Sequence, residues 1–275
     1  MSECFGNYFI RNGVLTPCGL FESSDVYEGD SFYEVIRMMG GVPLFFSDHM
    51  QRLEYSVSHS GAQMIVLPET VAESTIILRK HAGVREANLK VVFNYNGGKA
   101  TWLIYFIEPL YPTQQQYREG VPTILYHAER ENPGVKIINH RLRSSIYHKL
   151  IATGAYEAFL VDADGLITEG SRSNLFFVKE NRLYTAPDEK VLGGITRKHV
   201  VDICRLNGID VVFDCIPAVR IADYESAFMT GTSPMVLPVC SIDRCVFDTG
   251  HPLLARLLEL YMVRVKESLA AFRRP

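Results

Sequence analysis

The stretch EAFLVDADGLITEGSRSNLFFV, residues 157–178, decides the fold that the sequence predicts. An apolar strand, an Asp-Gly turn and a second strand make a short hairpin, which leads into a run of small polar residues. Strands that serve only packing rarely end in a carboxylate followed by Gly, Ser, Arg, Ser and Asn. Glu169, at the mouth of this hydrophobic sheet, is therefore the first candidate site residue.

The apolar pattern on either side of this hairpin predicts an α+β chain with two domains. Residues 1–112 are expected to form a small α+β domain. Residues 113–120, within the polar stretch YPTQQQYREG, have the composition of an interdomain linker. Residues 121–275 are expected to form a larger α/β domain that ends in a helix from about Pro252. Two domains suit a chain of 275 residues.

Turn and capping residues mark the predicted elements of the first domain. The glycine pair at 40–41 predicts a hairpin turn, and Ser47 predicts the N-cap of the helix that follows. Pro68 predicts the start of a second helix, and Gly83 predicts its end. The glycine pair at 97–98 predicts a turn between two further strands.

The composition disfavours several classes of function. With a formal net charge of -3 and a pI of about 6.3, the sequence has no basic cluster of the kind that binds nucleic acid. No run approaches the roughly 20 apolar residues of a membrane span, and the amino terminus lacks a signal-peptide pattern, so we expect a cytoplasmic protein. The six cysteines include no CxxC pair, so we expect reduced thiols rather than disulfides or a zinc site.

Two residues are candidates for covalent and acid-base chemistry. Lys136 has apolar neighbours, and burial lowers the pKa of a lysine, which favours a nucleophile that forms a Schiff base with a carbonyl cofactor. Glu169 is placed to hold a proton on a ring nitrogen of a bound cofactor. Each residue also has a plainer interpretation, because a strand lysine or a strand-end carboxylate usually points to solvent. The eight histidines lack metal-ligand spacing, so no metal site is predicted.

Other segments are candidates for holding a phosphate. In LGGITRK, residues 192–198, a glycine pair precedes a helix that would begin at Ile195 and Thr196, and helix N-termini present unpaired N–H groups. In MTGTSPM, Thr232 and Ser233 follow a strand and add hydroxyls and backbone amides. Arg52 carries a guanidinium, which grips phosphate well, although a helix arginine is more often a surface residue.

Taken in order, these segments resemble the class IV aminotransferases, the fold-type IV family of pyridoxal-phosphate enzymes. The family includes branched-chain and D-amino-acid aminotransferases and aminodeoxychorismate lyase. The resemblance runs from about Phe9 to Asp243 and rests on GDSFYEVIR (29–37), DHMQRL (48–53), KIIN (136–139), GAYEAFLVDADGLITEGSRSNLFFV (154–178), LGGITR (192–197) and FMTGTSPMVLPV (228–239).

The resemblance implies a two-domain fold-type IV enzyme that uses pyridoxal 5′-phosphate to move an amino group between a small amino acid and a 2-oxo acid. Lys136 would form the internal aldimine and shuttle the substrate proton, and Glu169 would pair with the pyridine nitrogen. Tyr33 would line the substrate side, and the family's homodimer implies that a partner loop closes the site. The phosphate would be held by Arg52, Ile195, Thr196, Thr232 and Ser233.

Departures from the family pattern keep other functions open. Asn94 is our candidate for a substrate contact. It begins the segment NYN, which stands where D-amino-acid aminotransferases have an Arg-x-His pattern that binds the substrate carboxylate. The asparagine three positions after the lysine, Asn139, resembles the pattern of aminodeoxychorismate lyase, an enzyme that releases pyruvate and 4-aminobenzoate. Glu34, in contrast, is closer to the pattern of the transaminases. A family member that has no catalytic activity is the third interpretation.

Overall fold

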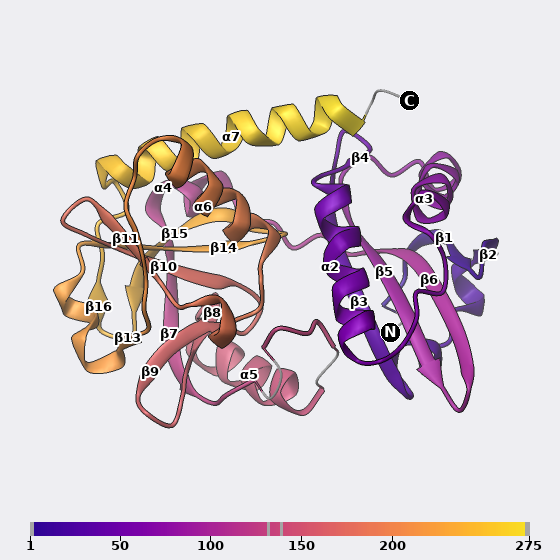
Figure 1. Cartoon of the computed structure of the whole chain (residues 1–275), viewed down its shortest axis with the longest axis horizontal. Helices are drawn as coiled ribbons and strands as arrows, with labels where there is room; N and C mark the ends of the chain where they lie inside the picture. Colours follow the sequence, from indigo (N-terminus) through magenta and orange to yellow (C-terminus); the bar gives the residue numbers. More distant parts are fainter. Residues whose placement is uncertain (1–2, 131–132, 138–139, 273–275) are drawn as a thin grey trace. The chain divides into compact units, whose positions relative to one another are not determined.

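The computed structural model describes residues 3–130, 133–137 and 140–272, with the elements labelled in Figure 1. The described residues form two compact units. Unit 1 comprises those of Met1–Leu110, Val135–Ile138 and Val265–Pro275, and unit 2 comprises those of Tyr111–Gly134 and Asn139–Arg264. The segment that carries Lys136 and the carboxy-terminal segment therefore belong to unit 1, whereas the sequence predicts both in the second domain.

A six-stranded antiparallel sheet forms the centre of unit 1, in the order β2-β1-β6-β5-β3-β4. Helices α2 and α3 pack on the sheet, α2 on β3 and α3 on β1 and β6 (Figure 1). Along β3, Glu34 and Ile36 point toward α2, whereas Tyr33 points to the other face. The elements are β1 (Phe5–Arg11), β2 (Val14–Pro17), η1 (Cys18–Leu20), α1 (Ser24–Tyr27), β3 (Asp30–Met39), β4 (Val42–Pro43), α2 (Phe46–His59), α3 (Pro68–Ala82), β5 (Ala87–Asn96) and β6 (Lys99–Ile107).

The predicted helix limits in unit 1 are confirmed for α3 but wrong for α2. Helix α3 begins at Pro68 and is capped by Gly83, whose φ of 64° is left-handed. The N-cap of α2 is Phe45 rather than Ser47, and Phe45 has a left-handed φ of 53°. Phe45 and Phe46 are both buried, so the burial of apolar side chains outweighs the capping preference of serine at this position.

The expectation that the cysteines are all reduced is wrong for one pair. Cys4 and Cys18 form a disulfide, and their Cα atoms lie 6.2 Å apart. The hairpin of β1 and β2 brings Cys18, the first residue of η1, back toward the residue that precedes β1. Because this contact depends on the pairing of two strands, the spacing of the cysteines along the sequence did not reveal it.

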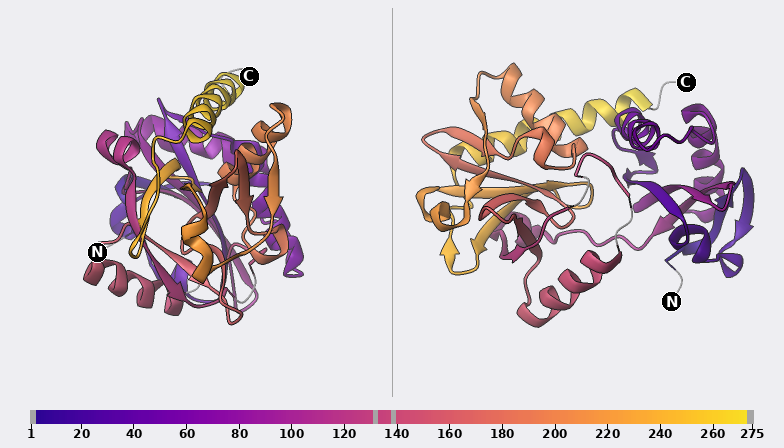
Figure 2. Two further views of the ribbon diagram at one scale, coloured as in Figure 1. Left: turned by 90° about the vertical axis from the view of Figure 1, so that its left-hand side faces the viewer. Right: turned by 60° about the horizontal axis from the view of Figure 1, so that its bottom comes forward.

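A mixed ten-stranded sheet forms the centre of unit 2. Its order is β12-β11-β10-β14-β15-β7-β8-β9-β13, and β16 pairs with β15. The sheet is curled (Figure 2), with β7 parallel to both β8 and β15. The strands are β7 (Val121–His127), β8 (Glu157–Val161), β9 (Leu166–Gly170), β10 (Asn174–Lys179), β11 (Arg182–Thr185), β12 (Val211–Phe213), β13 (Ile216–Pro217), β14 (Ser226–Gly231), β15 (Met235–Ile242) and β16 (Cys245–Val246).

Helices flank this sheet. The predicted hairpin within residues 157–170 is confirmed. The helices are α4 (Gln114–Glu119), α5 (His140–Thr153), α6 (Ile195–Leu206) and α7 (Pro252–Phe272), with short turns η2 (Asp188–Lys190) and η3 (Ala218–Asp223). The expected linker thus contains a helix, α4, which has no buried residue. Strands β8 and β9 pair antiparallel around a turn in which Gly165 has a φ of 78°. Within the described part of the chain, no helix has the length and apolarity that crossing a membrane requires.

Candidate active site

Lys136 is fixed at the edge of the unit 1 sheet. Its segment joins β3 through a bridge between Phe32 and Ile137, and the Tyr33 N–H donates to the Lys136 carbonyl at 3.3 Å. The Lys136 N–H donates to Ser56 Oγ at 3.3 Å. Lys136 is only 9% exposed, so the plainer interpretation of a lysine directed into solvent does not hold.

Glu34 lies at the centre of a charged cluster in unit 1. Its carboxylate accepts hydrogen bonds from Lys136 Nζ at 3.2 Å, from His49 Nδ1 at 2.7 Å, and from Arg52 Nε and Nη2, each at 2.7 Å. Burial raises the pKa of Glu34, but the charges of Arg52 and Lys136 hold this pKa well below its ordinary value. Glu34 is therefore a buried carboxylate whose single negative charge is shared by the lysine and the arginine.

His49 completes the cluster as a neutral donor. Burial lowers the pKa of His49 from 6.5 to about 4, although the hydrogen bond to Glu34 opposes this shift. A neutral ring that donates from Nδ1 satisfies one oxygen of Glu34 without adding a third positive charge.

Glu34 and His49 are not among the site residues predicted from the sequence. The signal for Glu34 was present, because it is a charged residue at an inward position of an apolar strand. His49 was not distinguishable from a surface residue of an amphipathic helix until its partner was known.

The other unit 1 candidates have defined contacts. The ring centroid of Tyr33 lies 5.2 Å from Lys136 Nζ. Arg52, expected to hold phosphate, places two donors on Glu34. Asn94 Nδ2 donates to the Glu28 carbonyl at 2.7 Å and to Ser31 Oγ at 2.8 Å, so both amide hydrogens are used within the chain. Asn139, the residue that resembles the lyase, lies outside the described residues.

Glu169 is the buried carboxylate of unit 2. Its Oε1 accepts from Arg130 Nε at 2.7 Å, and its Oε2 accepts from the Leu192 N–H at 3.0 Å and from Asn174 Nδ2 at 3.4 Å. Burial raises the pKa of Glu169, and the Arg130 guanidinium opposes this rise. The side chain is 3% exposed, so the plainer interpretation of a solvated carboxylate is wrong.

Glu157 holds the polar loop that follows Glu169. Its carboxylate accepts from Ser171 Oγ at 2.5 Å, from Ser173 Oγ at 3.0 Å and from the Arg172 N–H at 3.2 Å. These bonds explain why Ser171 and Ser173 follow Glu169 in the sequence. The two serines fix the turn between β9 and β10, and this turn sets the orientation of Glu169 at the end of β9.

The start of α6 forms a second cluster of polar residues in unit 2. Its N-cap, Gly194, supplies no side-chain cap for the N–H groups of the first turn. Thr196 Oγ1 donates to the Gly231 carbonyl at 3.1 Å, which ties this turn to the end of β14. The structure thereby brings together the four phosphate candidates of unit 2, which are Ile195, Thr196, Thr232 and Ser233.

Asn174 connects this group to Glu169. Its Nδ2 donates to the Leu192 carbonyl at 2.9 Å and approaches Glu169 Oε2, while a Cβ added to Gly194 would collide with its Oδ1. The glycine is therefore required by close approach rather than by an unusual φ, because its φ is -65°.

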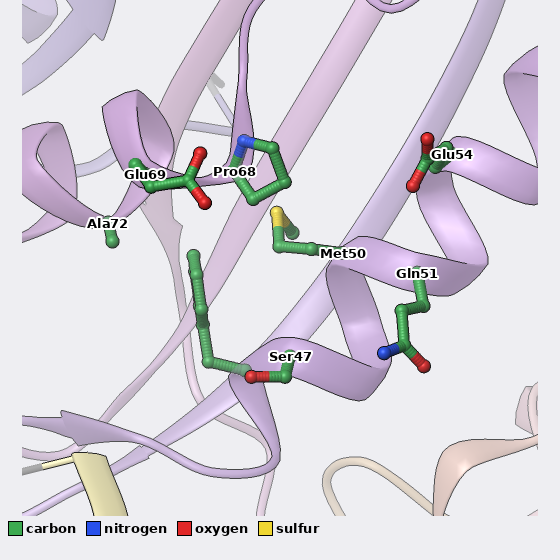
Figure 3. A pocket seen from close by; sticks show the side chains of 8 residues that line it. Ser47, Met50, Gln51, Glu54, Pro68, Glu69 and Ala72 are labelled. Atoms are coloured by element: carbon green, nitrogen blue, oxygen red, sulfur yellow. The ribbon is translucent and has the colours of Figure 1, made fainter.

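A cavity of about 260 Å³ lies between α2 and α3 in unit 1 (Figure 3). Its lining contains none of the predicted site residues. Helical spacing places His49, Arg52 and Ser56 on a different side of α2 from the lining residues of that helix. The lining consists of Phe46, Ser47, Met50, Gln51, Glu54, Pro68, Glu69 and Ala72.

Comparison with known proteins identifies the family of the chain. The family model described as "Amino-transferase class IV" matches residues 31–242. The chain is 28% identical over 235 residues to D-alanine aminotransferase from Bacillus licheniformis, covering 82% of this chain and 83% of the relative. It is 39% identical over 257 residues to a Rickettsia bellii protein named "Probable branched-chain-amino-acid aminotransferase", covering 86% and 87%.

Solved structures share the fold. A branched-chain amino acid aminotransferase from "T.th.", complexed with N-(5′-phosphopyridoxyl)-L-glutamate, has a TM-score of 0.84 at 24% identity and covers 98% of this chain and 97% of its own. At this identity the structural likeness shows the fold, whereas the matched family model extends over most of the chain. The chain therefore belongs to the class IV aminotransferases.

Proposed function

We propose that this protein is a pyridoxal-phosphate-dependent aminotransferase that moves an amino group between a small amino acid and a 2-oxo acid. Family membership supports the reaction class, and the neighbour bound to a phosphopyridoxyl compound supports the cofactor. The observation that carries the proposal is the environment of Lys136, a buried amine held by a buried carboxylate. A lysine in such a place is costly to bury and suits covalent chemistry.

The described residues fit this cofactor part by part. The amine of Lys136 suits the carbonyl carbon, and the buried carboxylate of Glu169 suits the pyridine nitrogen. The backbone N–H groups of the uncapped first turn of α6 and the hydroxyl of Thr232 would suit the phosphate, and the guanidinium of Arg52 is the phosphate candidate of unit 1.

The chain's own residues would prepare the reaction in defined ways. When bound, the cofactor supplies an electron sink for the electrons left at the substrate Cα. Lys136 Nζ would take the proton from the substrate Cα and deliver it to C4′ of the cofactor. Glu34 would stabilise the ammonium form of Lys136 and keep the amine directed to one place. Glu169 would hold a proton at the ring nitrogen, with its carboxylate oriented by the Leu192 N–H.

A donor panel tests the proposed reaction. The purified protein with pyridoxal phosphate is incubated with single L- or D-amino acids and a 2-oxo acid acceptor, and the new oxo acid is measured. We expect turnover for a subset of small donors, loss of turnover in Lys136→Ala, and unchanged turnover in Lys149→Ala, which alters an exposed lysine of α5. Normal turnover in Lys136→Ala would reject the assignment.

The same assay separates the alternatives. A lyase would release pyruvate and 4-aminobenzoate from aminodeoxychorismate without an oxo acid acceptor. A protein that neither binds the cofactor nor turns over any donor would be a non-catalytic member of the family. We also propose that the protein is a homodimer, as the family resemblance implies, and sedimentation of the purified protein measures this directly.

A further inference from the structure

Lys90 is a buried lysine that the proposed reaction does not use. It lies on β5, with a side chain that is 3% exposed. Its Nζ lies 5.9 Å from the ring centroid of Tyr27, 5.3 Å from that of Tyr33 and 5.7 Å from that of Tyr105. Aromatic faces attract a cation at such distances, so these three tyrosines and Lys90 form an aromatic cage, here called the Lys90 cage.

Glu3 neutralises the Lys90 cage. Its Oε1 accepts from Lys90 Nζ at 2.6 Å, and its Oε2 accepts from the hydroxyls of Tyr27 at 2.7 Å and Tyr105 at 3.0 Å. Burial raises the pKa of Glu3, but Lys90 and the hydrogen bonds bring this pKa below its ordinary value. Charge balance in the cage therefore depends on a residue that precedes the first strand of the chain.

Glu3 and Cys4, which precede β1, are here called the amino-terminal arm. Strand pairing gives this arm little support. Phe5 pairs with Phe106, but the pairing of β1 with β6 is irregular between Phe5 and Ile10. The covalent tie is the disulfide of Cys4, the residue next to Glu3, with Cys18.

The two cysteines of the disulfide differ in exposure. Cys4 is buried, whereas Cys18 is half-buried between the exposed residues Pro17 and Gly19. Thiol-disulfide exchange requires access of a thiolate to a sulfur atom. Cys18 is therefore the sulfur that a reductant would reach first.

We propose that the Cys4–Cys18 disulfide is a redox-sensitive tether that holds Glu3 on Lys90, and that its reduction releases the arm and uncovers the Lys90 ammonium. A dithiol reductant breaks the S–S bond, two electrons and two protons yield the two cysteine thiols, and the dithiol becomes a disulfide. The ring of Tyr33 contacts both Lys90 and Lys136, so the uncovered charge would lie beside the proposed cofactor lysine. This regulation goes beyond the proposed reaction.

Chemical labelling of Lys90 tests the tether without any enzyme assay. The full-length protein is prepared in oxidised form and in dithiothreitol-reduced form, and both are treated briefly with an acetylating N-hydroxysuccinimide ester. Mass spectrometry gives the acetylation of Lys90 relative to Lys99, an exposed lysine on β6. We expect the ratio to rise about tenfold on reduction, because labelling of a buried group requires local opening.

Two variants sharpen the result. Cys18→Ser should give the high ratio without reductant, whereas Cys240→Ser, which alters a half-buried cysteine outside the disulfide, should keep the wild-type redox response. Equal ratios in the oxidised and reduced wild-type protein would overturn the tether, as would a peptide map of the oxidised protein without a Cys4–Cys18 link. Neither readout needs the cofactor, so failure of the tether is distinguishable from failure of the proposed function.

Discussion

The substitution Glu34→Gln should destabilise unit 1 strongly. It keeps the shape of the side chain but removes the negative charge that Arg52 and Lys136 share. Glu34 is fully buried, and the side chains of Arg52 and Lys136 are only 10% and 11% exposed. Removing one partner of a buried ion pair costs about 3–5 kcal/mol, because it leaves the other charge without compensation. We expect the free energy of unfolding to fall by this amount at pH 7.

Urea unfolding followed by tryptophan fluorescence measures this loss in the relevant unit. Trp102 is the single tryptophan of the chain and lies buried in the core of unit 1. Glu22→Gln is the matched control, because Glu22 is 64% exposed and lies 3.9 Å from Arg11, and surface changes usually stay within about 0.5 kcal/mol. A loss below about 1 kcal/mol in Glu34→Gln would refute the assignment of Glu34 as the counter-ion of the cluster.

Three further outcomes are expected. Because His49 has a folded pKa of about 4, below its unfolded value of 6.5, stability should fall as pH drops from 6.5 toward 4, and a flat urea midpoint over this range would contradict its burial as a neutral ring. Glu157→Ala should cost about 1–3 kcal/mol by leaving buried donors unsatisfied, and should speed tryptic cleavage of the loop that it holds; unchanged cleavage would argue against that role. Gly194→Ala should weaken cofactor binding about tenfold in a fluorescence titration because its Cβ meets Asn174. Gly193→Ala, where a Cβ has open space, should bind as the wild type does, and equal affinities of the two variants would exclude the close approach as a cause.

Local signals predicted much of the secondary structure. Pro68 and Gly83 mark the two ends of α3 because a proline suits a first helical position and a glycine accepts the left-handed cap. The turn before β9 was predicted from Gly165, because a glycine accepts the left-handed φ that this turn requires. The N-cap of α2 was missed at Ser47 because the burial of neighbouring phenylalanines, a tertiary effect, decides where that helix begins.

The candidate site was predictable where its residues lie close together in the sequence. The loop from Glu169 to Asn174 is one short segment, and its polar composition already indicated a role other than packing. The partners of Lys136 were not predictable in this way, because Glu34 lies 102 positions away and meets it only through the edge of the sheet. Cys18 likewise meets its partner only after the first two strands have paired.

Borohydride trapping tests most directly whether Lys136 is the cofactor lysine. The purified protein is incubated with pyridoxal phosphate, reduced with sodium borohydride, digested and mapped by mass spectrometry. Reduction fixes the cofactor on whichever lysine holds it, so the phosphopyridoxyl group should be found on the peptide that contains Lys136. The same group on another lysine, or on none, would contradict the proposed chemistry of this protein.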